Sequence, residues 1–151
     1  MSAGEIWFYH LERTDLEAVL PPLLEKCLAR GWRALVRGGV EERLDALDVS
    51  LWTWRDDSFL AHGRAGRDEA ARQPVFLTSG GGNPNNASAL IAIDGADTGD
   101  AAAFERSIIL FDGRDEAALA IARARWKVAK EAGAAVSYWK QTGAGGWEKQ
   151  A

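Results

Sequence analysis

The sequence has a single cysteine, Cys27, among 151 residues, which excludes an internal disulfide and a zinc site built from cysteines. No apolar run approaches the roughly 18 residues of a membrane-spanning helix, and the first residues lack the basic start and apolar core of a signal peptide. A soluble cytoplasmic protein is therefore expected. Cys27 lies in an apolar helical pattern, which predicts a small buried core residue.

Motifs for catalysis, metal binding and nucleotide binding are also missing. The two histidines, His10 and His62, have no cysteine partners and form no His-Glu-x-x-His pattern. The Gly-rich segment 79–86 lacks the Lys-Ser/Thr of a phosphate-binding loop and precedes a predicted strand, so no helix N-terminus would face a phosphate. We expect no catalytic site, no cofactor and no metal, and we interpret 79–86 as a connecting loop.

Positive charge is scarce except near the end of the chain. The formal net charge is −4, which argues against non-specific binding to a phosphate backbone. Residues 114–140 nevertheless carry six Lys or Arg against three Asp or Glu, whereas residues 1–113 carry eleven against eighteen. Tryptophan is abundant, with seven residues, and such side chains fill cores or anchor interfaces.

The hydrophobic pattern predicts one three-layer α/β domain over residues 1–140, with a mostly parallel central sheet and helices on both faces. Residues 141–151 are Gly-rich and are expected to form a flexible C-terminal tail. The apolar spacing from Leu16 to Leu28 predicts the first helix. Pro21 and Pro22 leave two options for it: a kink, or a regular part that begins at Pro21. The expected strands are 6–9, 33–37, 74–78, 89–93, 108–111 and 135–139, and the other expected helices are 40–52 and 115–132.

The helix expected at 115–132 combines an apolar stripe with a basic edge. At 100° per residue, a stripe about 80° wide runs from Leu119 to Ala129 and includes Trp126. Arg123, Lys127 and Lys130 lie beside it, within about 60° of one another. This arrangement suits a peptide that ends in a hydrophobic side chain and a free carboxylate, which arginine binds through charge-assisted hydrogen bonds. A solvated basic helix face is the simpler alternative.

A second aromatic group follows the helix expected at 40–52. Trp52, Trp54 and Phe59 lie among charged residues and glycines. Such side chains either cover the core or form an exposed patch that a partner covers. A base-stacking platform for single-stranded DNA is a third option, which the acidic neighbours disfavour.

Several short segments, taken in their order and spacing, connect the chain to a known family. They are Trp7-Phe8-Tyr9, Leu51-Trp52 followed by Ser58-Phe59 and His62, Ala122-Arg123-Ala124-Arg125-Trp126-Lys127, then Gly133, and finally Tyr138-Trp139-Lys140. Through these segments the chain up to about Lys140 resembles the chi subunit of DNA polymerase III.

The resemblance implies a nucleotide-binding-like topology without nucleotide chemistry. It also implies a non-catalytic accessory subunit that joins the clamp-loader complex to the acidic C-terminal tail of single-stranded DNA-binding protein (SSB), and contacts DNA only indirectly. A second interface would take a psi-like clamp-loader subunit or a helicase. The positions that match the tail site are Arg123, Trp126 and Lys127, with Trp139 nearby. Those that match the second interface are Trp52 and Phe59.

One position departs from the family pattern. Leu119 stands where some members have a lysine, so the tail would bind less tightly here or use Lys130 instead. Two other functions remain open: a small nucleotide-binding α/β enzyme, because such folds bind ligands at strand ends, and a module that binds single-stranded DNA directly through its tryptophans.

Overall fold

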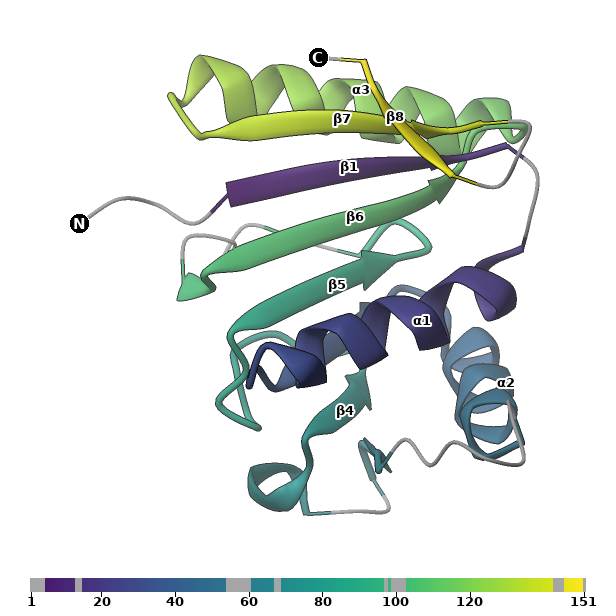
Figure 1. Ribbon diagram of the computed structural model, residues 1–151, viewed down its shortest axis with the longest axis vertical. Coiled ribbons are helices and arrows are strands. Elements are labelled where there is room, and N and C mark those ends of the chain that lie inside the picture. Colours follow the sequence, from purple (N-terminus) through teal and green to yellow (C-terminus); the bar gives the residue numbers. More distant parts are fainter. Residues whose placement is uncertain are drawn as a thin grey trace.

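A computed structural model describes residues 5–12, 15–53, 61–66, 69–96, 98, 103–142 and 146–150. In these residues eight strands form one sheet in the order β3-β4-β2-β5-β6-β1-β7-β8 (Figure 1). Every strand pair is parallel except β7 with β8. The strands are β1 Glu5–Leu11, β2 Ala34–Gly38, β3 Gly63–Arg64, β4 Val75–Thr78, β5 Ala89–Ile93, β6 Arg106–Asp112, β7 Val136–Gln141 and β8 Trp147–Lys149.

Helices cover both faces of the sheet, which confirms the predicted three-layer α/β architecture. Two helices, α1 (Leu16–Ala29) and α2 (Glu41–Trp52), pack on one face, and α3 (Glu116–Glu131) packs on the other. Figure 1 shows α1 in front of the sheet and α3 behind β7. A short 3-10 turn, η1 (Ala70–Arg72), precedes β4. The strands predicted from the hydrophobic pattern are all present, and β3 is an additional two-residue strand.

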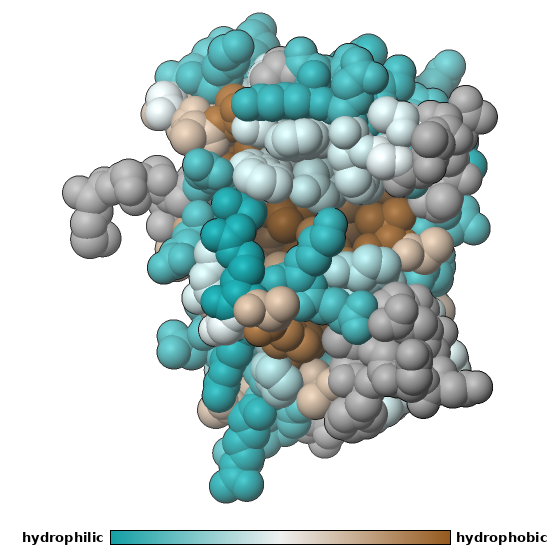
Figure 2. All heavy atoms as spheres, viewed as in Figure 1, coloured by the Kyte–Doolittle hydropathy of each residue, from teal (hydrophilic) through white to brown (hydrophobic). Residues whose placement is uncertain are grey.

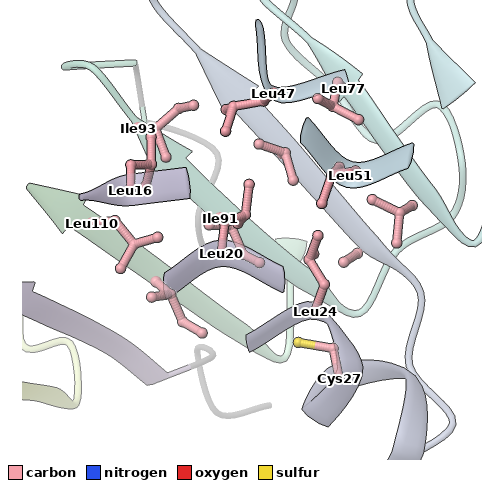
Figure 3. Packing of buried hydrophobic residues seen from close by; sticks show 14 of the residues in the cluster. Leu16, Leu20, Leu24, Cys27, Leu47, Leu51, Leu77, Ile91, Ile93 and Leu110 are labelled. Atoms are coloured by element: carbon pink, nitrogen blue, oxygen red, sulfur yellow. The ribbon is translucent and has the colours of Figure 1, made fainter. Parts of the chain in front are cut away.

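The largest core cluster lies between α1, α2 and the sheet. Leucines of α1 and α2 point toward Ile91, Ile93 and Leu110 on the strands, and Cys27 lies at the edge of the same cluster (Figure 3). Fully burying a leucine or isoleucine side chain stabilises a fold by about 1.5–3 kcal/mol. Cys27 is 4% exposed, as predicted for a core residue, and burial raises the pKa of its thiol.

The first helix continues through both prolines. α1 begins at Leu16, more than one turn before Pro21, so its regular part does not begin at Pro21. Each proline removes one backbone donor from the helix. Pro21 is buried and Pro22 is exposed, and the buried side chains on the same helix face include Leu20 and Leu24. Tertiary burial therefore holds together a helix that local propensity alone disfavours.

The segment 79–86 connects β4 to β5, as predicted, and its backbone carbonyls face inward. Arg37 on β2 donates to the carbonyl oxygens of Gly80 and Gly82, at 2.9 and 2.8 Å. The amide of Asn85, which is fully buried, donates to the carbonyl of Ala34 at 3.0 Å. Arg37 and Asn85 thus anchor this loop to β2, which fits a connecting loop.

The predicted flexible tail is corrected in part, because Trp147–Lys149 forms the edge strand β8. This strand pairs with β7 in an antiparallel register, and the ring of Trp147 stacks on Tyr9 with centroids 4.6 Å apart. An aromatic pair of this kind contributes about 0.5–1.5 kcal/mol beyond its burial. The glycines of the segment masked this strand in the sequence pattern.

The α-helices in the described ranges are α1, α2 and α3. None of the helices there combines the length and the hydropathy that a bilayer crossing requires.

Candidate functional site

The helix α3 carries the residues that the sequence singled out. The Asp115 side chain caps its N-terminus by accepting from the backbone N–H groups of Ala117 and Ala118, at 3.0 and 3.3 Å. Gly133, with φ of +82°, follows its C-terminal end and adopts a left-handed conformation that glycine tolerates without strain. Ala122 is buried against the sheet. The helix is therefore fixed at both ends and along one face.

Trp126 lies at the edge of the buried face of α3, beside two sheet aromatics. Its ring meets Phe8 edge-on at 5.4 Å and 74°, and meets Tyr138 edge-on at 5.7 Å and 84°. Phe8 and Tyr138 are paired in the register of β1 and β7, so both project toward α3. Trp126 is half-buried, which leaves part of the ring open to a ligand.

Three cations lie beside this aromatic group on α3. Arg123, Lys127 and Lys130 are exposed, and no ion pair joins any of them to another described residue. The ammonium group of Lys130 lies 5.5 Å from the centre of the Trp126 ring. The structure thus brings together four of the five residues predicted for the tail site.

Trp139, the fifth residue, lies on the opposite face of the sheet. Its ring packs against Trp7 at 5.6 Å, among residues that adjoin the α1 cluster. Successive side chains of a strand point to opposite faces, so Tyr138 reaches α3 and Trp139 does not. The expectation that Trp139 lies near the basic helix is corrected, and the strand alternation could have identified Tyr138 instead.

On the face that carries Trp7, Tyr9 and Trp139, no helix among the described residues lies in front of β1 and β7 (Figure 1). Figure 2 shows pale, weakly polar side chains over these strands and brown apolar atoms in the gap toward α1. The guanidinium of Arg106 lies 3.9 Å from the centre of the Trp7 ring. Arg106 also approaches Glu5, at 3.6 Å, so contacts within the chain already engage the aromatic and charged groups of this face.

Trp52 ends α2 and is 52% exposed, with its ring 4.2 Å from that of His62. Val49, one turn earlier, is 62% exposed. His62 is buried, and its Nε2 lies 3.0 Å from Asp48 Oδ1, so it connects the residues before β3 to α2. Of the two options for this aromatic group, the exposed patch holds for Trp52. Phe59 lies outside the described residues.

A crevice of about 580 Å³ lies at the carboxyl ends of β1, β5 and β6, between α1 and α3. Ligands of open α/β sheets bind at this kind of location. Its arginines are already engaged: Arg43 with Glu17 and Asp94, Arg114 with Asp112 and Asp15, and Arg125 with the carbonyls of Gly95 and Ala96.

The chemistry of this crevice disfavours a nucleotide. Asp115, which lines it, already caps the helix N-terminus that would otherwise receive a phosphate. Among the described side chains of the lining, five carboxylates outnumber three arginines, and this excess of negative charge repels a phosphate. The described residues also contain no group of three His, Cys, Asp or Glu that could hold a metal ion.

The fold is an α/β domain, and among the described residues the flank of α3 carries cations without ion pairs beside the aromatic rings. Residues 3–137 match the family described as DNA polymerase III chi subunit, HolC. The chain therefore belongs to the DNA polymerase III chi subunit family, whose members are accessory subunits of that replication enzyme.

A curated relative agrees with this family. The chain is 29% identical over 89 residues to the probable DNA polymerase III subunit chi of Rickettsia prowazekii (strain Madrid E). The match covers 59% of this chain and 54% of the relative, so the chain spans about half the length of the curated relative it matches.

Proposed function

We propose that this chain binds the acidic C-terminal tail of SSB and links SSB to the clamp-loader complex of DNA polymerase III. The observation that carries the proposal is the flank of α3, where Arg123, Lys127 and Lys130 are exposed beside Trp126 without ion pairs to other described residues. The formal charge of the whole chain is −4. A local cationic surface on an acidic protein attracts an acidic segment and repels basic surfaces.

Each residue of the flank has a separate role in the proposal. The Arg123 guanidinium forms two parallel hydrogen bonds with the terminal carboxylate of the tail. Lys127 and Lys130 attract the acidic residues that precede it, and their contribution is screened by salt. Trp126 and Tyr138 together provide the apolar wall against which the last hydrophobic side chain of the tail packs.

Titration calorimetry with a synthetic peptide of the SSB C-terminal tail tests the assignment. Arg123→Ala is expected to weaken binding by about 1.5–3 kcal/mol, the scale of a hydrogen bond to a charged group. Arg72→Ala serves as the control, because Arg72 is 81% exposed and precedes β4 at the other end of the sheet. Equal affinity of the wild type and Arg123→Ala would reject the assignment.

We also propose that the exposed end of α2 binds a second protein of the replication machinery, a psi-like subunit or a helicase, through Trp52 and Phe59. Trp52 and Val49 are large apolar side chains open to solvent, one turn apart, and such anchors are typical of interface centres. Pull-down with the candidate partner tests this interface. Trp52→Ala should abolish capture of that partner and leave tail binding intact, whereas Arg123→Ala should do the reverse.

A further inference from the structure

The tail site adjoins a polar pair formed by the buried His10 and the half-buried Tyr138. Nδ1 of His10 lies 2.6 Å from the Tyr138 hydroxyl oxygen, and Tyr138 is the residue whose ring meets Trp126. His10 is 7% exposed, and its ring fills the space where a side chain at Gly113 would lie. His10 is thus packed against Gly113 and hydrogen-bonded to the Tyr138 hydroxyl, so it determines where that hydroxyl points.

Charged groups on β6, β7 and α3, together with Glu12 just after β1, surround this pair. Nε2 of His10 lies 2.7 Å from Oε1 of Glu12, without the alignment of a hydrogen bond. The Lys140 ammonium lies 3.5 Å from the same carboxylate oxygen. Arg123 on α3 and Asp112 on β6 are also close enough to interact electrostatically with His10.

These surroundings favour the neutral form of His10 at neutral pH. Burial lowers the pKa of His10, Lys140 and Arg123 lower it further, and Glu12 raises it. In the neutral ring Nδ1 accepts the hydrogen of the Tyr138 hydroxyl, because the phenol remains protonated: burial raises the pKa of Tyr138. In this state the tyrosine has no hydrogen to offer to a ligand.

Protonation of His10 reverses the hydrogen bond. A proton taken from solvent occupies Nδ1, which then donates to the Tyr138 oxygen. The phenolic hydrogen becomes free to rotate toward the open side of the ring, where Arg123 lies close enough for its charge to lower the pKa of the same hydroxyl. A carboxylate bound to Arg123 would accept this hydrogen, and its negative charge would in turn favour the protonated imidazole.

We propose that the His10–Tyr138 pair is the proton-linked half of a subsite for a terminal carboxylate, with Arg123 as the other half, Tyr138 as the ligand-contacting donor and His10 as the residue that positions it. This proposal rests on the function proposed above and specifies which part of an acidic tail is recognised. The subsite selects a free carboxyl terminus, and one proton is taken up when it is filled.

Calorimetry with two synthetic SSB-tail peptides tests the subsite, one with a free C-terminal carboxylate and one with a C-terminal amide. Titrations between about pH 5.5 and 8, in buffers of different ionisation enthalpy, measure affinity and proton uptake together. For the wild-type chain, affinity for the free-carboxylate peptide should rise as the pH falls, with net proton uptake. The amidated peptide should show neither effect.

Two variants separate the roles. Tyr138→Phe keeps the ring against Trp126 and should lower the affinity for the free-carboxylate peptide about fivefold at the acidic end, with no effect on the amidated peptide. His10→Gln should remove the pH dependence and the proton uptake. Far-UV circular dichroism checks that both variants fold.

The outcomes distinguish this inference from the proposed function. If Arg123→Ala weakens binding but Tyr138→Phe and His10→Gln leave the affinity and its pH dependence unchanged, the inference is wrong and the proposed function stands. If the wild type binds neither peptide, the proposed function itself fails.

Discussion

Two groups of cationic side chains, one on β2 and β3 and the other on α3 over β1 and β7, differ in what surrounds them. On β2 and β3, Arg37 and Arg64 are only 3% and 5% exposed. Arg37 donates to two loop carbonyls, and Arg64 is paired with Glu41 and Asp45. On α3 the cations are exposed and have no ion pair to other described residues.

This difference separates arginines that stabilise the fold from cations that can bind a ligand. A buried guanidinium whose donors are satisfied by its own chain has none left for a partner, and removing it leaves unsatisfied groups. An exposed cation without a partner retains its electrostatic potential for an approaching anion. Composition and net charge do not distinguish the two cases.

The largest predicted effect comes from removing a cation of the buried group. Arg37→Met should lower the free energy of unfolding by about 3 kcal/mol, because hydrogen bonds from a charged donor to Gly80 and Gly82 are lost. Urea denaturation followed by tryptophan fluorescence measures the change. Arg123→Met is the matched variant on α3 and should stay within about 0.5 kcal/mol of the wild type. A comparable loss in both variants would contradict the distinction.

A smaller loss of stability is expected at Gly113, which follows β6 and packs against His10 on β1. A methyl group at Gly113 would lie 1.7 Å from Nε2 of His10, so Gly113→Ala must displace that ring. Such overpacking costs about 1–3 kcal/mol of unfolding free energy. Gly81→Ala is the control, since nothing lies within 4 Å of a methyl group there. Thermal melts of both variants test the prediction, which fails if the two are equally stable.

Acid should weaken the fold through the same histidine. The pKa of His10 is lowered in the folded protein, by burial first of all, from an ordinary value of 6.5. The unfolded chain therefore binds the proton more readily, so stability is fully present above that value and falls as the pH drops below it. His10→Gln should flatten this part of the stability profile. An unchanged profile would show that the pKa of His10 is the same in the folded and unfolded states.

The smallest effect is expected for a single lysine of the exposed group. Lys130→Gln should weaken tail binding by about 0.5 kcal/mol at low salt, and less at high salt, because the contact is exposed and screened. Lys26→Gln, an exposed lysine in the last turn of α1, should leave binding unchanged. Calorimetry at two salt concentrations measures both. Equal effects of the two lysines would indicate non-local attraction rather than a site on α3.

The elements of the fold could be predicted from the sequence because their signals are local. Apolar periodicity located every long strand and the helices at 40–52 and 115–132, and it placed Arg123, Lys127 and Lys130 on one edge of a helix with Trp126 beside them. The two-residue strand β3 and the edge strand β8 gave no such signal, since one is too short for a period and the other follows glycines.

The sequence by itself determined the layered α/β architecture and the basic flank of α3, because helix and strand periods are properties of neighbouring residues. Only the tertiary structure decided which cations are paired within the described residues, that Tyr138 rather than Trp139 meets Trp126, and that His10 supports Tyr138. The reason is separation in the sequence: His10 and Tyr138 are 128 positions apart, and only the parallel pairing of β1 with β7 brings them together.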